Sequence, residues 1–225
     1  MLKLAILISG RGSNMEAVAK ACRDGLIAAS VAVVISDDPS AGGLAVAREL
    51  GIETAVVAKP SFPDRAAFER ALIEQIEAHR AEVIVLAGFM RVLSPEFTRR
   101  YEGRLINIHP ALLPKYKGLH THGRVLEAGD TAHGASVHFV TAELDGGPVV
   151  LQSRIAVRAA ETEKDLAARV LQTEHVILPR VIGWLAERRL TWRDGKGWLD
   201  GRPLEAPVVE DFRRPSDDAE AVKGH

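Results

Sequence analysis

Short aliphatic runs alternate with amphipathic stretches along the first hundred residues of this 225-residue chain, and this alternation limits the folds open to it. A continuous apolar run is typical of a parallel strand buried on both faces, whereas apolar residues three or four apart indicate a helix. The runs predict strands over residues 4–8, 31–35, 53–58 and 83–87. The stretches between them predict helices that begin at residue 13 and span residues 41–50 and 64–79. Because such alternation requires right-handed crossovers, we expect an α/β fold with a Rossmann-like, doubly wound, mostly parallel sheet.

The second half of the chain has a less regular pattern. Strands are expected over residues 105–108, 135–140 and 149–157, followed by a long helix over 162–187 and a small hairpin over 192–199. No internal repeat or long linker divides the chain. We therefore expect a single domain over residues 1–200, made of a Rossmann-like, phosphate-binding half (1–100) and a mixed half (101–200). Residues 201–225 would form a C-terminal extension whose polar end, 213–225, is disordered.

The charge balance excludes two classes of partner. Lys and Arg total 29 against 30 Asp and Glu, so the net charge of -1 provides no basic excess to attract nucleic acid or an anionic membrane. The apolar run at the N-terminus is too short for a signal peptide, and no stretch approaches the ~20 apolar residues of a membrane span. The single cysteine, Cys22, makes neither an internal disulfide nor a cysteine-based zinc site. We expect a cytoplasmic protein.

A glycine-containing turn, Gly10-Arg11-Gly12-Ser13-Asn14, joins the first predicted strand to the first predicted helix. Glycines let a ligand approach the backbone closely, and the free N–H groups at a helix start attract an anion. Ser13 and Glu16 also form a capping-box pattern. Met15 occupies the place where a dinucleotide site needs a small residue, and the P-loop lysine is absent, so the turn favours a single phosphate. The alternative is a helix-capping turn with no ligand.

Asn107 and His109 lie two residues apart at the end of a predicted strand. The two-residue period of a strand places both side chains on one face, and Pro110 ends the pairing. Substrates bind at the carboxyl ends of strands in open α/β sheets, so this pair is a candidate catalytic site. A hydrogen-bonded structural histidine is the alternative.

Two carboxylates outside that strand are further candidates. Asp145 precedes a Gly-Gly pair that sets it at the tip of a turn, although local sequence alone also describes an ordinary turn-forming aspartate. Glu174 falls on the apolar stripe of the long predicted helix, where an unpaired carboxylate is costly, so we expect it to have a partner. A carboxylate at the edge of the stripe that reaches water is the alternative.

Five of the eight histidines lie close together in the sequence, namely His109, His120, His122, His133 and His138. Metal sites usually add a carboxylate or thiolate at close helical or loop spacing, as in H-E-x-x-H, and no similar pattern is present here, so we expect no metal. His138 alternates with Val137 and Phe139 in a predicted strand, which indicates a structural role.

Five segments together resemble the phosphoribosylglycinamide formyltransferase family of purine synthesis. They are I-S-G-R-G-S-N (8–14), A-G-F-M-R-V-L-S-P (87–95), N-I-H-P-A-L-L-P-K-Y-K-G-L-H-T-H (107–122), H-G-A-S-V-H-F-V (133–140) and L-D-G-G-P-V (144–149). The N-x-H-P-x-x-L-P and D-x-G-x-P patterns are shared with the wider formyltetrahydrofolate group, which includes methionyl-tRNA formyltransferase and formyltetrahydrofolate hydrolase. G-R-G-S-N and G-L-H-T-H select the glycinamide branch.

The resemblance implies a formyltransferase fold and transfer of a formyl group from 10-formyltetrahydrofolate to the amine of glycinamide ribonucleotide, with no metal. The positions that match the family's catalytic residues are Asn107, His109 and Asp145. Those that match its contacts to the phosphate and ribose of the substrate are Gly12, Ser13, Asn14 and Glu174. Those that match its folate contacts are Arg65, Phe89, Met90, Arg91, Val92, Leu93, Val140 and Asp145.

These residue types suit the implied reaction. Attack of an amine on a formyl carbonyl produces an oxyanion, which Asn107 and a protonated His109 can stabilise. Asp145 is expected to favour the charged form of His109 and to relay the amine proton.

Two residues depart from the family pattern. Arg11 stands where some relatives have a small or amide residue, and Lys117 replaces a proline in the loop over residues 112–131. We expect this loop to close over the substrates.

Two other functions remain open. A hydrolase that releases formate from the same folate is one alternative. A Rossmann-type nucleotide-binding module, supported by Asp37 after the second strand, is the other. We expect a monomer or a homodimer.

Overall fold

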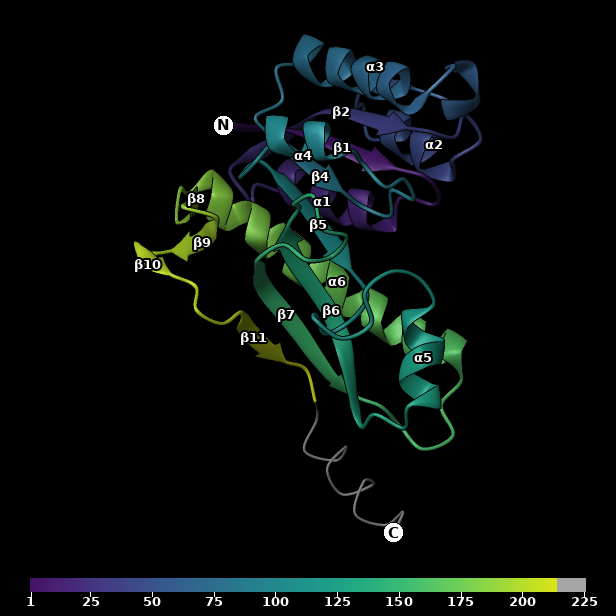
Figure 1. Cartoon of the computed structure of the whole chain (residues 1–225), viewed down its shortest axis with the longest axis vertical. Coiled ribbons are helices and arrows are strands. Elements are labelled where there is room, and N and C mark those ends of the chain that lie inside the picture. The colour runs from purple at the N-terminus through teal and green to yellow at the C-terminus, as the bar shows by residue number, and fades with distance from the viewer. Residues whose placement is uncertain (214–225) are drawn as a thin grey trace.

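The computed structural model describes residues 1–213, so the expected disorder at the end of the chain lies, from residue 214 on, outside the described residues. Eight strands form one sheet in the order β11-β7-β6-β5-β4-β1-β2-β3 (Figure 1). Its strands are β1 (Leu2–Ile8), β2 (Ala29–Ser36), β3 (Thr54–Val56), β4 (Val83–Leu86), β5 (Leu105–His109), β6 (Ala132–Phe139), β7 (Val149–Ala156) and β11 (Val208–Asp211). The helices are α1 (Ser13–Arg23), α2 (Gly42–Glu49), α3 (Arg65–Ala78), α4 (Pro95–Arg100), α5 (Thr121–Glu127) and α6 (Glu163–Ala186), with a short 3-10 turn at Lys59–Ser61.

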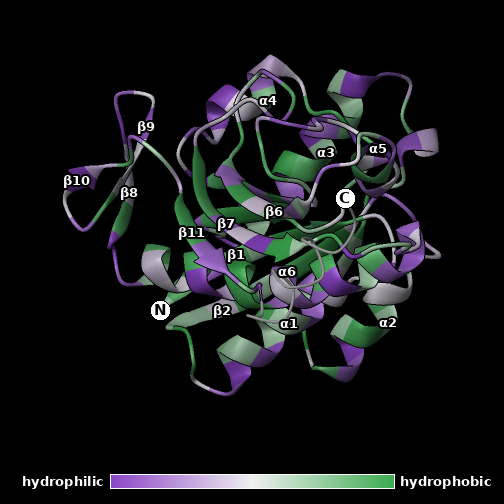
Figure 2. Ribbon diagram, turned by 90° about the horizontal axis from the view of Figure 1, so that it is seen from below, coloured by the Kyte–Doolittle hydropathy of each residue, from purple (hydrophilic) through white to green (hydrophobic). Residues whose placement is uncertain are grey.

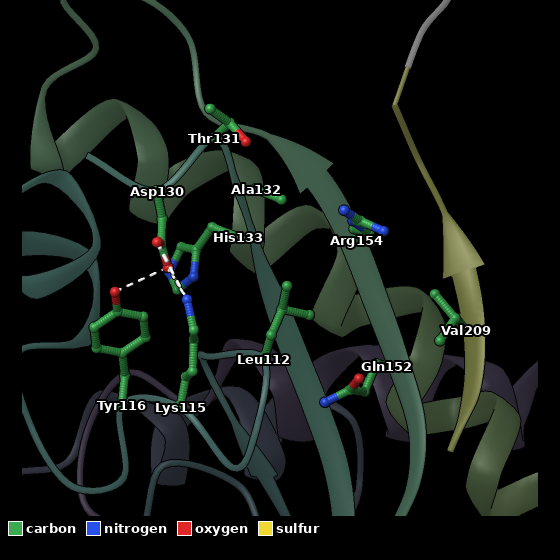
Figure 3. Close-up of a pocket in the computed structure, with 10 residues that line it drawn as sticks. All are labelled: Leu112, Lys115, Tyr116, Asp130, Thr131, Ala132, His133, Gln152, Arg154 and Val209. Atoms are coloured by element: carbon green, nitrogen blue, oxygen red, sulfur yellow. Dashed lines mark hydrogen bonds and ion pairs between the residues drawn. The ribbon is translucent and has the colours of Figure 1, made fainter. Parts of the chain in front are cut away.

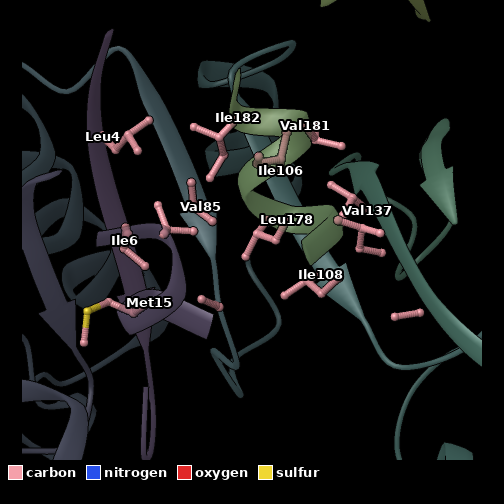
Figure 4. Packing of buried hydrophobic residues seen from close by; sticks show 14 of the residues in the cluster. Leu4, Ile6, Met15, Val85, Ile106, Ile108, Val137, Leu178, Val181 and Ile182 are labelled. Carbon is pink, nitrogen blue, oxygen red and sulfur yellow. The ribbon is translucent and has the colours of Figure 1, made fainter. Parts of the chain in front are cut away.

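The expected doubly wound, mostly parallel sheet is confirmed. Strands β1 to β5 pair in parallel, and helices cover both faces. On β1, Leu4 and Ile6 face the core cluster shared with α1, α2 and α6, whereas Ala5 and Leu7 face the cluster shared with α3 and α4. Figure 4 shows the first cluster, in which Leu178 and Ile182 of α6 pack over the strands. Figure 2 shows hydrophobic residues concentrated on these central strands.

The direction of the sheet reverses at β6, which pairs antiparallel with both β5 and β7. The mixed character expected for the second half is therefore confirmed. The register places Asn107 opposite His138 and His109 opposite Ser136. This pairing brings polar residues of two neighbouring strands to one place.

Several local expectations differ from the structure. The capping box is wrong, because Gly12 in a left-handed conformation precedes α1, Ser13 is already helical, and no side chain caps the helix. The third strand is shorter than expected, at Thr54–Val56. Helices α4 and α5 were not expected, since each is only two turns or less and carries little apolar periodicity.

The C-terminal part is more ordered than the sequence suggests. The expected hairpin is confirmed by β8 (Leu190–Arg193) and β9 (Lys196–Leu199), which form a three-stranded sheet with β10 (Arg202–Pro203). Strand β11 lies in the expected extension and pairs in parallel with β7 at the edge of the main sheet. Within residues 1–213, no helix combines the length and apolar character needed to cross a membrane.

Candidate active site

Asn107 and His109 project from one face of β5, as the strand period predicts, at its carboxyl end. His109 is buried, and its Nε2 lies 2.9 Å from the backbone oxygen of Tyr116, to which it donates. The Nδ2 of Asn107 lies 3.1 Å from the Nε2 of His138 on the neighbouring strand. His138 Nδ1 is 2.8 Å from the carbonyl oxygen of Phe139, so its other ring nitrogen is free to accept from Asn107.

Asp145 reaches the same place from the turn between β6 and β7. Its Oδ2 lies 3.5 Å from His109 Nδ1, and its Oδ1 lies 3.7 Å from His138 Nε2. The turn depends on Gly147, because a side chain there would place its Cβ 1.9 Å from the carbonyl oxygen of Phe139. The three candidate catalytic side chains therefore converge.

His138, for which the strand alternation predicts a structural role, is a fourth member of this cluster. It contacts both Asn107 and Asp145 while remaining buried. Its alternation with Val137 and Phe139 gave no sign of this role. Its role could have been found from its pairing opposite Asn107, but that pairing follows only once β6 is known to run antiparallel to β5.

Burial dominates the charge state of the imidazole. It lowers the pKa of His109 below its ordinary value of 6.5, and this effect outweighs the opposing contributions of the Tyr116 carbonyl and the Asp145 carboxylate. The expectation that Asp145 favours the charged imidazole is confirmed for that interaction, and burial sets the direction of the net shift. Burial also acts to raise the pKa of Asp145, but the neighbouring His138 side chain, the hydrogen bond from the Gly118 N–H and the nearby His109 lower it overall. Asp145 is thus an ionised base at neutral pH beside a mainly neutral imidazole.

The loop expected over residues 112–131 lies directly against this cluster and contains α5. Its Tyr116 carbonyl accepts from His109, and its Gly118 N–H donates to Asp145 Oδ2 at 2.8 Å. Lys117, the departure from the family pattern, forms an ion pair with Glu143 at 2.7 Å. The loop therefore occupies hydrogen-bonding positions on both His109 and Asp145.

A second set of contacts holds the outer side of the loop over residues 112–131. Lys115 and the Tyr116 hydroxyl both donate to Asp130 Oδ2 at 2.9 Å, as the dashed lines in Figure 3 show. These residues line a cavity of about 360 Å³ that also includes Arg154 of β7 and Val209 of β11.

The glycine turn brings Gly12, Ser13 and Asn14 to the start of α1. Gly12 has a φ of 74°, and a Cβ there would lie 2.8 Å from the Cα of Gly43, so the position requires glycine. Glu174 has a partner, as its position on the apolar stripe predicts. The partner is Asn14, whose Nδ2 donates to Glu174 Oε2 at 2.6 Å. Both residues are buried, and within the described part of the chain the Oδ1 of Asn14 has no hydrogen-bond partner.

Most of the candidate folate residues line one cavity beside the catalytic cluster. It has a volume of about 140 Å³, and its walls include Phe89, Arg91, Val92, Leu93, Asn107, His138, Val140 and Asp145. Met90 is 63% exposed at its edge. Arg65 lies apart, in a cavity of about 550 Å³ between α3 and α4.

The structure bears on two other kinds of site, a nucleotide-binding site at Asp37 and a metal site. Asp37, which supported a nucleotide-binding module, is buried with Oδ1 engaged by Ser9 and Oδ2 engaged by Arg91. Both carboxylate oxygens therefore accept from protein groups and do not face an open ribose site. Among residues 1–213, no three His, Cys, Asp or Glu side chains are arranged to hold a metal ion.

Comparisons with known proteins agree with this geometry. The sequence profile of the formyl transferase family matches residues 2–182. The chain is 50% identical over 203 residues to a phosphoribosylglycinamide formyltransferase of Escherichia coli, which covers 90% of this chain and 96% of that protein. It is 42% identical over 204 residues to the enzyme of the same name from Haemophilus influenzae, with 91% and 96% covered.

Solved structures show the same likeness. A phosphoribosylglycinamide formyltransferase from Coxiella burnetii, determined in complex with CHES, superimposes with a TM-score of 0.89 at 43% identity and covers 92% of this chain and 98% of that one. A glycinamide ribonucleotide transformylase from Symbiobacterium toebii gives a TM-score of 0.86 at 39% identity, with 88% and 94% covered. The chain therefore belongs to the formyl transferase family, within its phosphoribosylglycinamide formyltransferase branch.

Proposed function

We propose that this protein transfers a formyl group from 10-formyltetrahydrofolate to the amine of glycinamide ribonucleotide, producing formylglycinamide ribonucleotide and tetrahydrofolate. The single observation that carries the proposal is the convergence of Asn107, His109 and Asp145 beside a cavity at the carboxyl end of β5. The names of the relatives that match nearly the whole chain support the choice of substrates.

The chemistry follows from the three side chains. The amine nitrogen attacks the formyl carbon, a C–N bond forms, and the carbonyl oxygen becomes an oxyanion. Asn107 donates to this oxyanion from Nδ2, and His109 donates from a ring N–H once substrate displaces the Tyr116 carbonyl. Each such donor contributes roughly 2.7–4 kcal/mol to stabilising the transition state.

Asp145 accepts the amine proton in this mechanism and passes it on. Its depressed pKa keeps the carboxylate ionised at neutral pH, ready to take a proton from the attached nitrogen. The proton is then passed to N10 of the folate as the bond between N10 and the formyl carbon breaks. The amine loses one proton and the leaving nitrogen gains one, so no other reagent is needed.

The phosphate and ribose contacts are assigned to Gly12, Ser13, Asn14 and Glu174. The first turn of α1 has no side-chain cap, so its N–H groups point toward an incoming anion. The unpartnered Oδ1 of Asn14 supports a polar ligand at the same place, because buried polar atoms in proteins are usually paired.

The folate is assigned to the 140 Å³ cavity and the surface at its edge. That volume is below the ~300–1,000 Å³ of pockets that enclose a drug-sized ligand, so only one end of a folate would be enclosed. The remainder would extend across exposed Met90 and Val92, and Arg65 is assigned to its glutamyl end.

The test is a reaction of purified protein with 10-formyltetrahydrofolate, with and without glycinamide ribonucleotide. We expect tetrahydrofolate and formylglycinamide ribonucleotide to form in equal amounts, and only when the amine is present. Release of formate without the amine would replace this function with that of a hydrolase. Binding of NAD with no binding of folate would favour the nucleotide module.

Glu174→Gln is expected to separate stability from substrate binding. Burial raises the pKa of Glu174 above its ordinary 4.5, despite the hydrogen bond from Asn14, so the ionised carboxylate costs folding free energy at neutral pH. Glutamine carries no charge and still accepts from Asn14. The variant should therefore be more stable than the wild type at neutral pH and gain nothing below pH 4.5, where the glutamate is protonated in both states.

The same variant should bind the nucleotide substrate less well. We expect its KM for glycinamide ribonucleotide to rise by about tenfold, the effect of losing one charged hydrogen bond. Denaturant unfolding at both pH values and steady-state kinetics measure the two effects. A loss of stability at neutral pH would contradict the charge argument, and an unchanged KM would remove Glu174 from the substrate site.

A further inference from the structure

The segment over residues 88–94, which follows β4, is tied at its start to a buried carboxylate that the proposed mechanism does not use. Ser9 Oγ donates to Asp37 Oδ1 at 2.6 Å and accepts from the Met90 N–H at 2.9 Å. The Arg91 guanidinium pairs with the other carboxylate oxygen of Asp37. Asp37 is only 3% exposed, so its charge is offset by these contacts.

The end of the segment is tied to a second buried carboxylate, Glu69 of α3. Glu69 Oε1 accepts from the Ser94 N–H at 2.7 Å, and its Oε2 accepts from the Ser94 hydroxyl. The Ser94 hydroxyl in turn accepts from the Phe97 N–H at 3.1 Å and caps α4. Glu69 is 6% exposed, so it is as inaccessible to water as Asp37.

Between these two anchors the backbone is irregular. Residues 89–94 belong to no helix or strand, although Phe89 and Leu93 pack into the core and Arg91, Val92 and Leu93 line the cavity assigned to folate. Met90 and Val92 are 63% and 62% exposed. One backbone hydrogen bond, from the Ser9 N–H to the Gly88 carbonyl at 3.1 Å, supports the start of the segment, and the described contacts include no backbone–backbone hydrogen bond for residues 89–93. The position of those residues therefore depends on the side-chain contacts at the two ends.

We propose that Asp37 and Glu69 are positioning residues that hold segment 88–94 in the conformation that receives the folate. The proposal rests on the proposed function, because it takes this segment as the folate contact. Hydrogen bonds to an ionised carboxylate are about twice as strong as neutral ones, so two of these anchors can preorganise an otherwise irregular segment. Among the described contacts, neither Asp37 nor Glu69 forms a hydrogen bond with a catalytic side chain. Replacing either carboxylate should therefore weaken folate binding and leave the chemical step unchanged.

Asp37→Asn and Glu69→Gln test this with little change in shape. Each should raise the KM for 10-formyltetrahydrofolate by about tenfold, which is the loss expected when one charged hydrogen bond is weakened. The kcat and the KM for glycinamide ribonucleotide should stay within about twofold of wild type. Calorimetric titration with tetrahydrofolate should show the same loss of affinity.

Matched controls exist for both positions. Asp38→Asn removes the same charge one residue away, where the residue is half-buried and its carboxylate bonds Ser40. Glu74→Gln removes an exposed carboxylate from the same helix as Glu69. Both controls should leave all three kinetic constants unchanged.

Three results would overturn the proposal. They are an equal rise in both KM values, a fall in kcat with unchanged KM for folate, or an effect of Asp38→Asn as large as that of Asp37→Asn. If Asp37→Asn does not fold, Ser9→Ala removes the contacts of Ser9 with Asp37 and with the Met90 N–H, leaves the pair of Asp37 with Arg91 in place, and should raise the KM for folate in the same way. Failure of the proposed function is seen separately, since wild-type protein would then not formylate glycinamide ribonucleotide at all.

Discussion

Replacement of Asp145 by asparagine is expected to lower kcat by about 10²- to 10⁴-fold, the usual contribution of a positioned acid or base. The amide cannot accept the amine proton, and it no longer supplies negative charge 3.5 Å from His109 Nδ1. It keeps the shape of the carboxylate, so both KM values should change little. Steady-state assays of tetrahydrofolate formation, together with single-turnover rates, measure the chemical step directly.

Glu143→Gln is the matched control for this change. Glu143 lies in the same turn, is largely exposed and pairs with Lys117, so its replacement should leave kcat close to that of wild type. The double variant of Asp145→Asn with His109→Asn should lose far less than the product of the two single effects, because residues that act as a unit are not additive. Near-normal turnover of Asp145→Asn would remove the carboxylate from the mechanism.

Asn107→Ala is expected to lower kcat by about 10²- to 10³-fold, the cost of removing one oxyanion donor. The negative charge on this oxygen develops in the transition state and is absent from the bound substrates, so kcat and kcat/KM should fall together while the KM values stay nearly constant. Unfolding curves serve as the control for loss of the contact between Asn107 and His138. A variant that raised KM without lowering kcat would place Asn107 in substrate binding and not in stabilisation of the oxyanion.

The order of elements in the first half could be predicted because each signal is local. The aliphatic run ending at Ile8, the glycine turn and the helix stripe that includes Met15 and Val18 all lie within a few residues of each other. The two-residue period of a strand was likewise enough to place Asn107 and His109 on one face. Glu174 was identified as a residue in need of a partner because its position on the apolar stripe can be read from the helix period.

Other features depend on residues far apart in the chain. Helix α5 lies inside a loop whose position is set by contacts to His109, Asp130 and Asp145, not by its own periodicity. Strand β11 is short and contains two acidic residues, and it is ordered by pairing with β7 at the sheet edge. Asp37 has the spacing of a ribose-binding acid, yet the structure pairs it with Ser9 and Arg91.

The sequence by itself determined the alternation of strands and helices and the glycine turn at the start of α1, because periodicity and turn chemistry act between near neighbours. The choice of Asn107, His109 and Asp145 together as catalytic candidates came from the resemblance of the sequence to the family. Only the tertiary structure decided that β6 runs antiparallel beside β5, which sets His138 against Asn107, and that Asn14 is the partner of Glu174. It also decided the charge of His109, whose pKa is lowered by burial more than the nearby carboxylate raises it. Strand neighbours, burial and hydrogen-bond partners arise from contacts across the whole chain, and hydrophobic periodicity contains no information about which distant segment will supply them.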